Sequence, residues 1–122
     1  MIENLALSIA IDPRKNRIRV HKSTLHALGD PRWIQLLFNP EGQVLAIRAA
    51  TRKLPGGHEI RIRPREICGQ EFELYSSLLF YQMRHSCIRM EKGYTYKLTG
   101  EYKAAKNTVF FRFSTMVRNE NE

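Results

Sequence analysis

Arginines alternate with branched aliphatic residues twice in this chain, in residues 17–21 (RIRVH) and in residues 60–65 (IRIRPR). Because successive side chains of a strand point to opposite faces, each run predicts a strand with one apolar face and one cationic face. The apolar face is suited to a core, and the arginine face is suited to water or to a polyanion. The doubled pattern therefore predicts a small sheet protein that binds nucleic acid.

The charge balance agrees with a polyanionic partner. The chain has 122 residues, enough for one ordinary domain, and its 20 Lys and Arg against 12 Asp and Glu give a net charge of +8. Its apolar runs are too short to span a bilayer, and its first residues lack the features of a signal peptide. Cys68 and Cys87 have no metal-ligand or CxxC spacing. We therefore expect a cytoplasmic protein with free thiols and no membrane partner.

The first half predicts four strands and one short helix. Residues 5–11, 17–21, 33–38 and 43–49 have strand patterns, and turn residues separate the two pairs at 12–16 and 39–42. Residues 22–28 predict a helix with Ser23 or Thr24 as the N-cap, Leu25 and Leu28 facing inward, and Gly29 as the stop. Residues 51–58 contain Leu-Pro-Gly-Gly and predict a linker.

The second half predicts a similar order with longer connections. Residues 59–63 predict a strand, and residues 66–89 a helical region with Leu74, Leu78, Leu79 and Met83 facing inward. Residues 94–98 and 108–113 predict strands. Residues 99–106 either extend both strands around a turn at Gly100 or form a separate excursion, and residues 119–122 should fray.

These elements predict an α+β fold, a small β-barrel built of two strand-helix-hairpin units. The units are residues 1–50 and residues 59–118, joined by the linker 51–58, with the second unit packed on the first and divergent in its longer helix. The two arginine runs are 44 residues apart (61 − 17), which is compatible with an internal duplication but leaves it open.

Short motifs in residues 5–50 resemble a known family. They are Arg17-Ile18-Arg19-Val20, Lys22, Leu25, Leu28-Gly29, Ile34, Leu36, Glu41-Gly42 and Val44-Leu45-Ala46-Ile47. Together they resemble the swapped-hairpin domain of the AbrB/SpoVT/MazE-like transcription factors, and two such units in tandem are similar to the MraZ-type arrangement. The family pattern has Gly where this chain has Asn16 and Pro where it has His21.

The resemblance implies a DNA-binding transcriptional regulator whose basic strand-turn elements lie against the duplex. Members of the family usually form dimers or rings with interleaved strands. If this chain supplies both halves it could be a monomer that imitates a dimer, and if only the first half has the fold we expect a homodimer.

Two basic patches are the candidate nucleic-acid contacts. The principal patch places five cations within nine positions, on a turn and its adjoining strand: Arg14, Lys15, Arg17, Arg19 and Lys22. The secondary patch comprises Arg61, Arg63 and Arg65. The alternative for both is a solvated edge whose charge prevents strand-to-strand aggregation. Arg48, Arg52 and Lys53 are expected to be simply solvated.

Two other functions stay open from the sequence. An antitoxin-like or accessory subunit could dock a protein partner through the apolar region Leu74–Tyr81. A single-strand or RNA-binding module could use aromatics interleaved with cations on the last two strands, although such aromatics are more often core residues. The residues concerned are Tyr94, Tyr96, Lys97, Tyr102, Lys103, Phe111, Arg112 and Phe113.

Catalytic and metal-binding motifs are missing from the sequence. It has no nucleophile elbow, P-loop, HExxH or Rossmann glycine pattern, and its four histidines have no metal-ligand spacing. We therefore expect neither an enzyme nor a cofactor or metal site.

Overall fold

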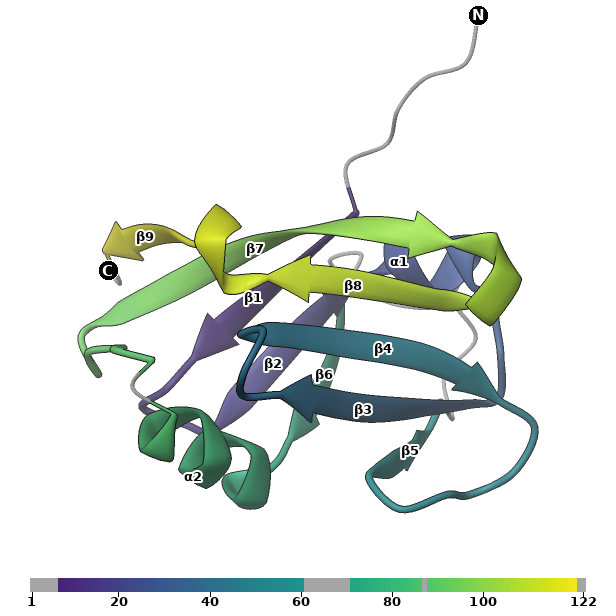
Figure 1. Cartoon of the computed structure of the whole chain (residues 1–122), viewed down its shortest axis with the longest axis horizontal. Coiled ribbons are helices and arrows are strands. Elements are labelled where there is room, and N and C mark those ends of the chain that lie inside the picture. Colours follow the sequence, from purple (N-terminus) through teal and green to yellow (C-terminus); the bar gives the residue numbers. More distant parts are fainter. Residues whose placement is uncertain (1–6, 61–70, 87, 121–122) are drawn as a thin grey trace, which may run out of the picture.

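The computed structural model describes residues 7–60, 71–86 and 88–120. In these residues nine strands form one antiparallel sheet that curves into a nearly closed barrel, with two α-helices at opposite ends (Figure 1). The predicted α+β barrel is confirmed at this level. In chain order the elements are β1 (Leu7–Asp12), β2 (Arg17–His21), α1 (Lys22–Ala27), β3 (Trp33–Asn39), β4 (Val44–Ala50), β5 (Gly57–Glu59), β6 (Glu71–Tyr75), α2 (Ser77–His85), β7 (Tyr94–Lys103), the 3-10 turn η3 (Ala104–Lys106), β8 (Thr108–Arg112), the 3-10 turn η4 (Phe113–Thr115) and β9 (Val117–Glu120).

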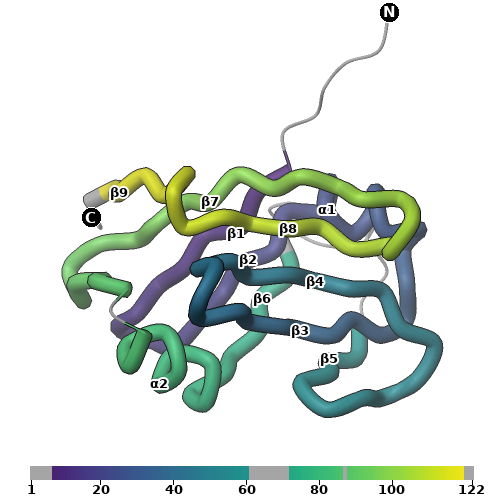
Figure 2. Tube along the Cα trace, in the orientation of Figure 1, coloured from purple at the N-terminus to yellow at the C-terminus, as the bar shows by residue number. Residues whose placement is uncertain are grey.

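Strands from the two halves of the chain are interleaved in the sheet. The order is β5-β3-β4-β8-β7-β1-β2-β6, with β9 paired to β7. The β1–β2 hairpin therefore lies between β7 and β6, and β4 pairs with β8. The tube in Figure 2 shows these early and late segments side by side. Both halves consequently share one core.

The core is formed by the apolar side of each alternating strand. Ile9 and Ile11 of β1 and Ile18 and Val20 of β2 are fully buried, as the alternation predicts. Phe80 and Met83 of α2 and large residues from the other strands fill the interior with them. The fully buried members include Ile34, Leu45, Ile47, Met83, Leu98 and Phe111. Burial of this continuous apolar surface is the main favourable contribution to folding.

Local backbone signals in the first half have mixed outcomes. The predicted N-cap at Ser23 or Thr24 is wrong, because the cap is His21, whose Nδ1 accepts the Ser23 backbone N–H at 3.1 Å. Gly29 ends the helical segment with φ of +85°, as predicted. Asn16, where the family pattern has Gly, adopts φ of +52° at the β1–β2 turn. Asparagine tolerates this left-handed conformation better than most residues, so Asn16 is compatible with a tight turn.

The single helix predicted for residues 66–89 is wrong. Residues 71–75 form strand β6, which pairs with β2, and α2 covers only Ser77–His85. Ser76 begins α2, since its Oγ accepts the Leu79 N–H at 3.1 Å. Leu79 and Met83 are buried as predicted, and Leu74 is buried on a strand. Leu78, predicted to face inward, is 66% exposed.

The remaining boundaries of the second half also shift. The predicted linker ends in strand β5, which pairs with β3, whereas the predicted strand at 59–63 lies largely outside the described residues. Of the two alternatives for 99–106, strand extension is correct. However, β7 continues through Gly100 and the turn is η3. Of the tail predicted to fray, residues 119 and 120 belong to β9, where Asn119 pairs with Thr95, and residues 121–122 lie outside the described residues.

His58 on β5 predicts a pH dependence of stability. Burial lowers the pKa of this half-buried imidazole below its ordinary value of 6.5. The folded protein then binds fewer protons than the unfolded chain, so stability is full above pH 6.5 and falls as the pH drops towards the folded-state pKa. Urea unfolding at pH 7.5 and 5.0 should show a smaller pH effect in His58→Asn than in the wild type. An unchanged pH effect in that variant, with His85→Asn as the control, would contradict this assignment.

Candidate nucleic-acid interface

On the outer surface of β2, β1 and β7, one cation lies on each side of the small residue Ala10. Ala10 of β1 pairs with Arg19 of β2 on one side and with Lys97 of β7 on the other. Because Ala10 has only a methyl group, a hollow of about 220 Å³ opens above it. Its lining also includes Ser8, His21, Thr95 and Asn119. Two cations with hydroxyl and amide groups beside them in the lining form an arrangement suited to an oxyanion such as a phosphate.

The β1–β2 turn adds two exposed cations to this surface. Asp12 is buried, and its Oδ1 accepts the Arg14 backbone N–H at 3.1 Å while its Oδ2 accepts Arg17 Nη2 at 3.0 Å. Lys15 N–H donates to the Asp12 carbonyl at 3.3 Å. These bonds fix the turn backbone, and the side chains of Arg14 and Lys15 are exposed at its tip. We call Arg14, Lys15, Arg19, His21 and Lys97 the β1 face.

The five cations of the predicted principal patch are not equivalent. Arg17 has only 11% of its side chain exposed and is paired with Asp12 and, at 3.5 Å, with Glu73 of β6. Arg19 shares Glu73 at 3.5 Å but keeps 32% of its side chain exposed. Lys22 is half-buried at the start of α1. The expectation that the whole arginine side of β2 is open to solvent is therefore wrong at Arg17, whose environment is that of a structural residue.

His21 borders the hollow with a fixed ring. Its Nδ1 accepts the Ser23 backbone N–H and lies 2.8 Å from Ser23 Oγ. In the neutral imidazole the proton is consequently on Nε2, which is then the donor nitrogen of the ring. A ring held in this way can contribute a directed donor at the edge of the site.

Lys97 was not part of either predicted basic patch and was named only among the cations interleaved with aromatics on the last strands. Its alternation with Tyr94 and Tyr96 gives its face on the strand, but its position beside Ala10 depends on the pairing of β7 with β1, which is 87 residues distant (97 − 10). The interpretation of the surrounding aromatics as core is confirmed for Tyr96, Phe111 and Phe113, which are buried. Lys97 itself is exposed.

The secondary patch, Arg61, Arg63 and Arg65, lies outside the described residues. Its proposed contact with nucleic acid stays a prediction from the sequence.

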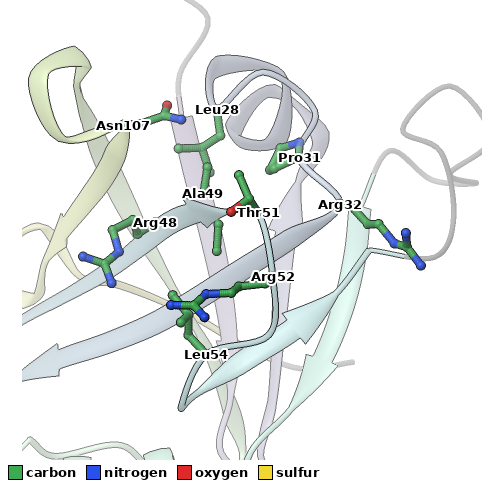
Figure 3. A pocket seen from close by; sticks show the side chains of 10 residues that line it. Leu28, Pro31, Arg32, Arg48, Ala49, Thr51, Arg52, Leu54 and Asn107 are labelled. Carbon is green, nitrogen blue, oxygen red and sulfur yellow. The ribbon is translucent and has the colours of Figure 1, made fainter.

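A larger hollow of about 600 Å³ lies between the end of α1 and the β4–β5 connection, and three arginines line it (Figure 3). Arg32 and Arg48 do not converge. Arg32 is paired with Glu59 at 3.1 Å, and Arg48 Nη2 donates to Gln35 Oε1 instead of being simply solvated. Figure 3 shows Arg32 and Arg48 pointing away from one another. This hollow is therefore a weaker candidate for an anion site than the β1 face.

Comparison with known proteins does not assign the chain, since no family model, curated protein or solved structure matches it. In the part of the chain that the structure describes, no helix is both long and apolar enough to cross a membrane. The same residues contain no group of three His, Cys, Asp or Glu side chains placed to bind a metal ion. The functional argument therefore depends on the geometry and charge of the β1 face.

Proposed function

We propose that this protein binds duplex DNA through the β1 face and acts as a transcriptional regulator. The observation on which this depends is the cross-strand row of Arg19, Ala10 and Lys97, with the hollow of about 220 Å³ above Ala10. Phosphate contacts from these cations and from the turn residues Arg14 and Lys15 supply most of the affinity. Arginine at the rim can also reach guanine O6 and N7 where the turn enters the major groove.

The topology supports the same proposal through the family resemblance. In each half a strand leads directly into a helix, β2 into α1 and β6 into α2, and a hairpin follows. β3 pairs with β5 as β7 pairs with β1, and the two hairpins meet where β4 pairs with β8. When β1, β3 and β4 of the first half are matched with β5, β7 and β8 of the second, these pairings are the same for both halves. We therefore infer a swapped-hairpin barrel, as in the tandem MraZ-type arrangement, in which one chain supplies both halves and imitates a dimer.

Neutralising Lys97 tests the proposal. We expect Lys97→Gln to weaken binding to random duplex DNA about 3- to 10-fold at low salt. The slope of log K against log salt should decrease by about one, because one phosphate contact is lost. Fluorescence anisotropy across a salt titration measures both quantities. Lys15→Gln, at the exposed turn tip, should behave similarly.

Lys53→Gln is the matched control for this test. Lys53 is exposed on the β4–β5 connection, away from the β1 face, and its substitution changes the net charge by the same amount. Equal losses in Lys53→Gln and Lys97→Gln would indicate binding by overall charge alone and would contradict the proposed interface.

A second candidate function is that of a protein-interaction subunit. Leu78 and Tyr81 on α2 are 66% and 54% exposed, and Tyr75 at the end of β6 is also exposed. Large apolar side chains gathered on one surface are typical of docking sites. Co-purification of a stoichiometric protein partner would favour this function over DNA binding.

A further inference from the structure

An apolar row crosses the outer surface of the sheet on strands that are not part of the β1 face. Leu37 of β3 pairs with Ala46 of β4, and Ala46 pairs with Phe110 of β8. Leu37 is exposed and Phe110 is half-buried, so both are accessible at the surface. Ala46 is too small to fill the space between them, and the row therefore forms a shallow trough with an aromatic ring as one wall.

Two hollows continue this trough along the strands. They have volumes of about 330 and 470 Å³ and share Leu37, Ala46 and Phe110 in their linings. Arg112 borders the first, and Arg48 and Lys106 border the second. Arg112 pairs with Val44, four residues before Arg48 on β4, so the two cationic ends are about 13 Å apart along the strand. We call Leu37, Ala46, Arg48, Lys106, Phe110 and Arg112 the Phe110 face.

The charge of this face is predominantly positive. Glu101, which pairs with Phe110 in the register, is bonded to Lys103 at 3.2 Å. Among the described residues, Arg112 and Lys106 make no ion pair with a carboxylate. Arg48 is oriented by Gln35, whose Nε2 donates to the Pro55 carbonyl at 2.8 Å. The trough is thus apolar at its centre and cationic at both ends.

We propose that the Phe110 face binds a short single-stranded nucleic-acid segment. One base stacks on the Phe110 ring above Ala46, and Arg112 at one end and Arg48 and Lys106 at the other contact the flanking phosphates. Aromatic side chains with adjacent cations on an open sheet are a recurrent way to hold unpaired bases. The positive charge at both ends favours this polyanion over an uncharged peptide. The site is separate from the β1 face and does not depend on duplex binding.

Anisotropy with a fluorescent oligothymidine probe tests this proposal. We expect Phe110→Leu, which keeps an apolar side chain but removes the stacking ring, to weaken probe binding at least about 10-fold. Arg112→Gln should weaken it about 3- to 5-fold and reduce its salt dependence. Tyr81→Leu is the control, because it removes an exposed aromatic ring from α2 and should leave the affinity unchanged. Lys97→Gln should retain probe binding, so this test is independent of the duplex interface.

Three outcomes would overturn the proposal. They are failure of the wild type to bind the probe at low salt, equal binding by Phe110→Leu and wild type, and equal losses in Phe110→Leu and Tyr81→Leu. The first outcome would exclude single-stranded nucleic acid as the occupant of this face. If Phe110→Leu does not fold, photo-crosslinking of wild type to a probe containing bromouridine decides the question. Crosslinks should map to residues 108–112, and their absence there would contradict the site.

Discussion

Replacing Arg17 by methionine is expected to lower the free energy of unfolding by about 3 kcal/mol, because it leaves the carboxylate of Asp12 buried without its charged partner. Only 4% of the Asp12 side chain and 11% of the Arg17 side chain are exposed. Asp12 also holds the β1–β2 turn through the Arg14 backbone N–H, so loss of the ion pair loosens the turn. Urea denaturation monitored by circular dichroism measures this change.

Two comparisons separate the ion pair from a general loss of charge. Arg14→Met removes an exposed cation from the same turn and should change stability by less than about 0.5 kcal/mol. The double variant Asp12→Asn, Arg17→Met should be less destabilised than the sum of the two single variants, because neither partner is then left charged alone. Additive effects would show that the two side chains act independently and would contradict the assignment.

Adding a side chain at Gly100 is the second substitution with a large expected effect. A Cβ at this position would lie 2.5 Å from Phe111 Cε1 and 2.7 Å from Val109 Cγ1, which are both on the paired strand β8. Phe111 and Val109 are fully buried, so neither can move away without disturbing the core. We expect Gly100→Ala to cost about 2 to 3 kcal/mol, as for other overpacked cores, in the same denaturation experiment.

Gly93→Ala provides the matched control. Gly93 precedes the same strand, its φ is not in the left-handed region, and no atom of the described residues lies within 4 Å of an added Cβ. Its substitution should be nearly neutral. Comparable destabilisation by the two alanines would indicate a general effect of glycine loss instead of a steric conflict at Gly100.

The alternation of residues along the chain was sufficient to predict the inner and outer sides of most strands. Ile18 and Val20 are buried as predicted, and Ile34 and Leu36, which alternate on β3, are buried as well. The strand β6 was missed even though Glu71 to Tyr75 also alternates polar and apolar residues. The leucines that follow continue the apolar pattern and favoured one long helix, and short apolar segments are ambiguous between the two periods. Pairing with β2 decides the conformation.

The partners of the site residues depend on contacts between distant parts of the chain. Arg17 is paired with Glu73, 56 residues away, and no local pattern indicates that a strand carrying Glu73 lies beside β2. The same holds for Lys97, which reaches the β1 face through the pairing of β7 with β1. The basic turn could be predicted because Asp12, Arg14 and Lys15 are neighbours in sequence and their hydrogen bonds are local.

The insertion of the β1–β2 hairpin between β6 and β7 has a consequence for biosynthesis. The first two strands leave the ribosome long before the segments that flank them: the outer edge of β2 has no native neighbour until β6 has been translated, and that of β1 has none until β7 has been translated. The native sheet therefore cannot close before nearly the whole chain has left the ribosome. Fragments ending before residue 94 should expose unpaired strand edges and aggregate, because every route to the finished fold passes through long-range pairing.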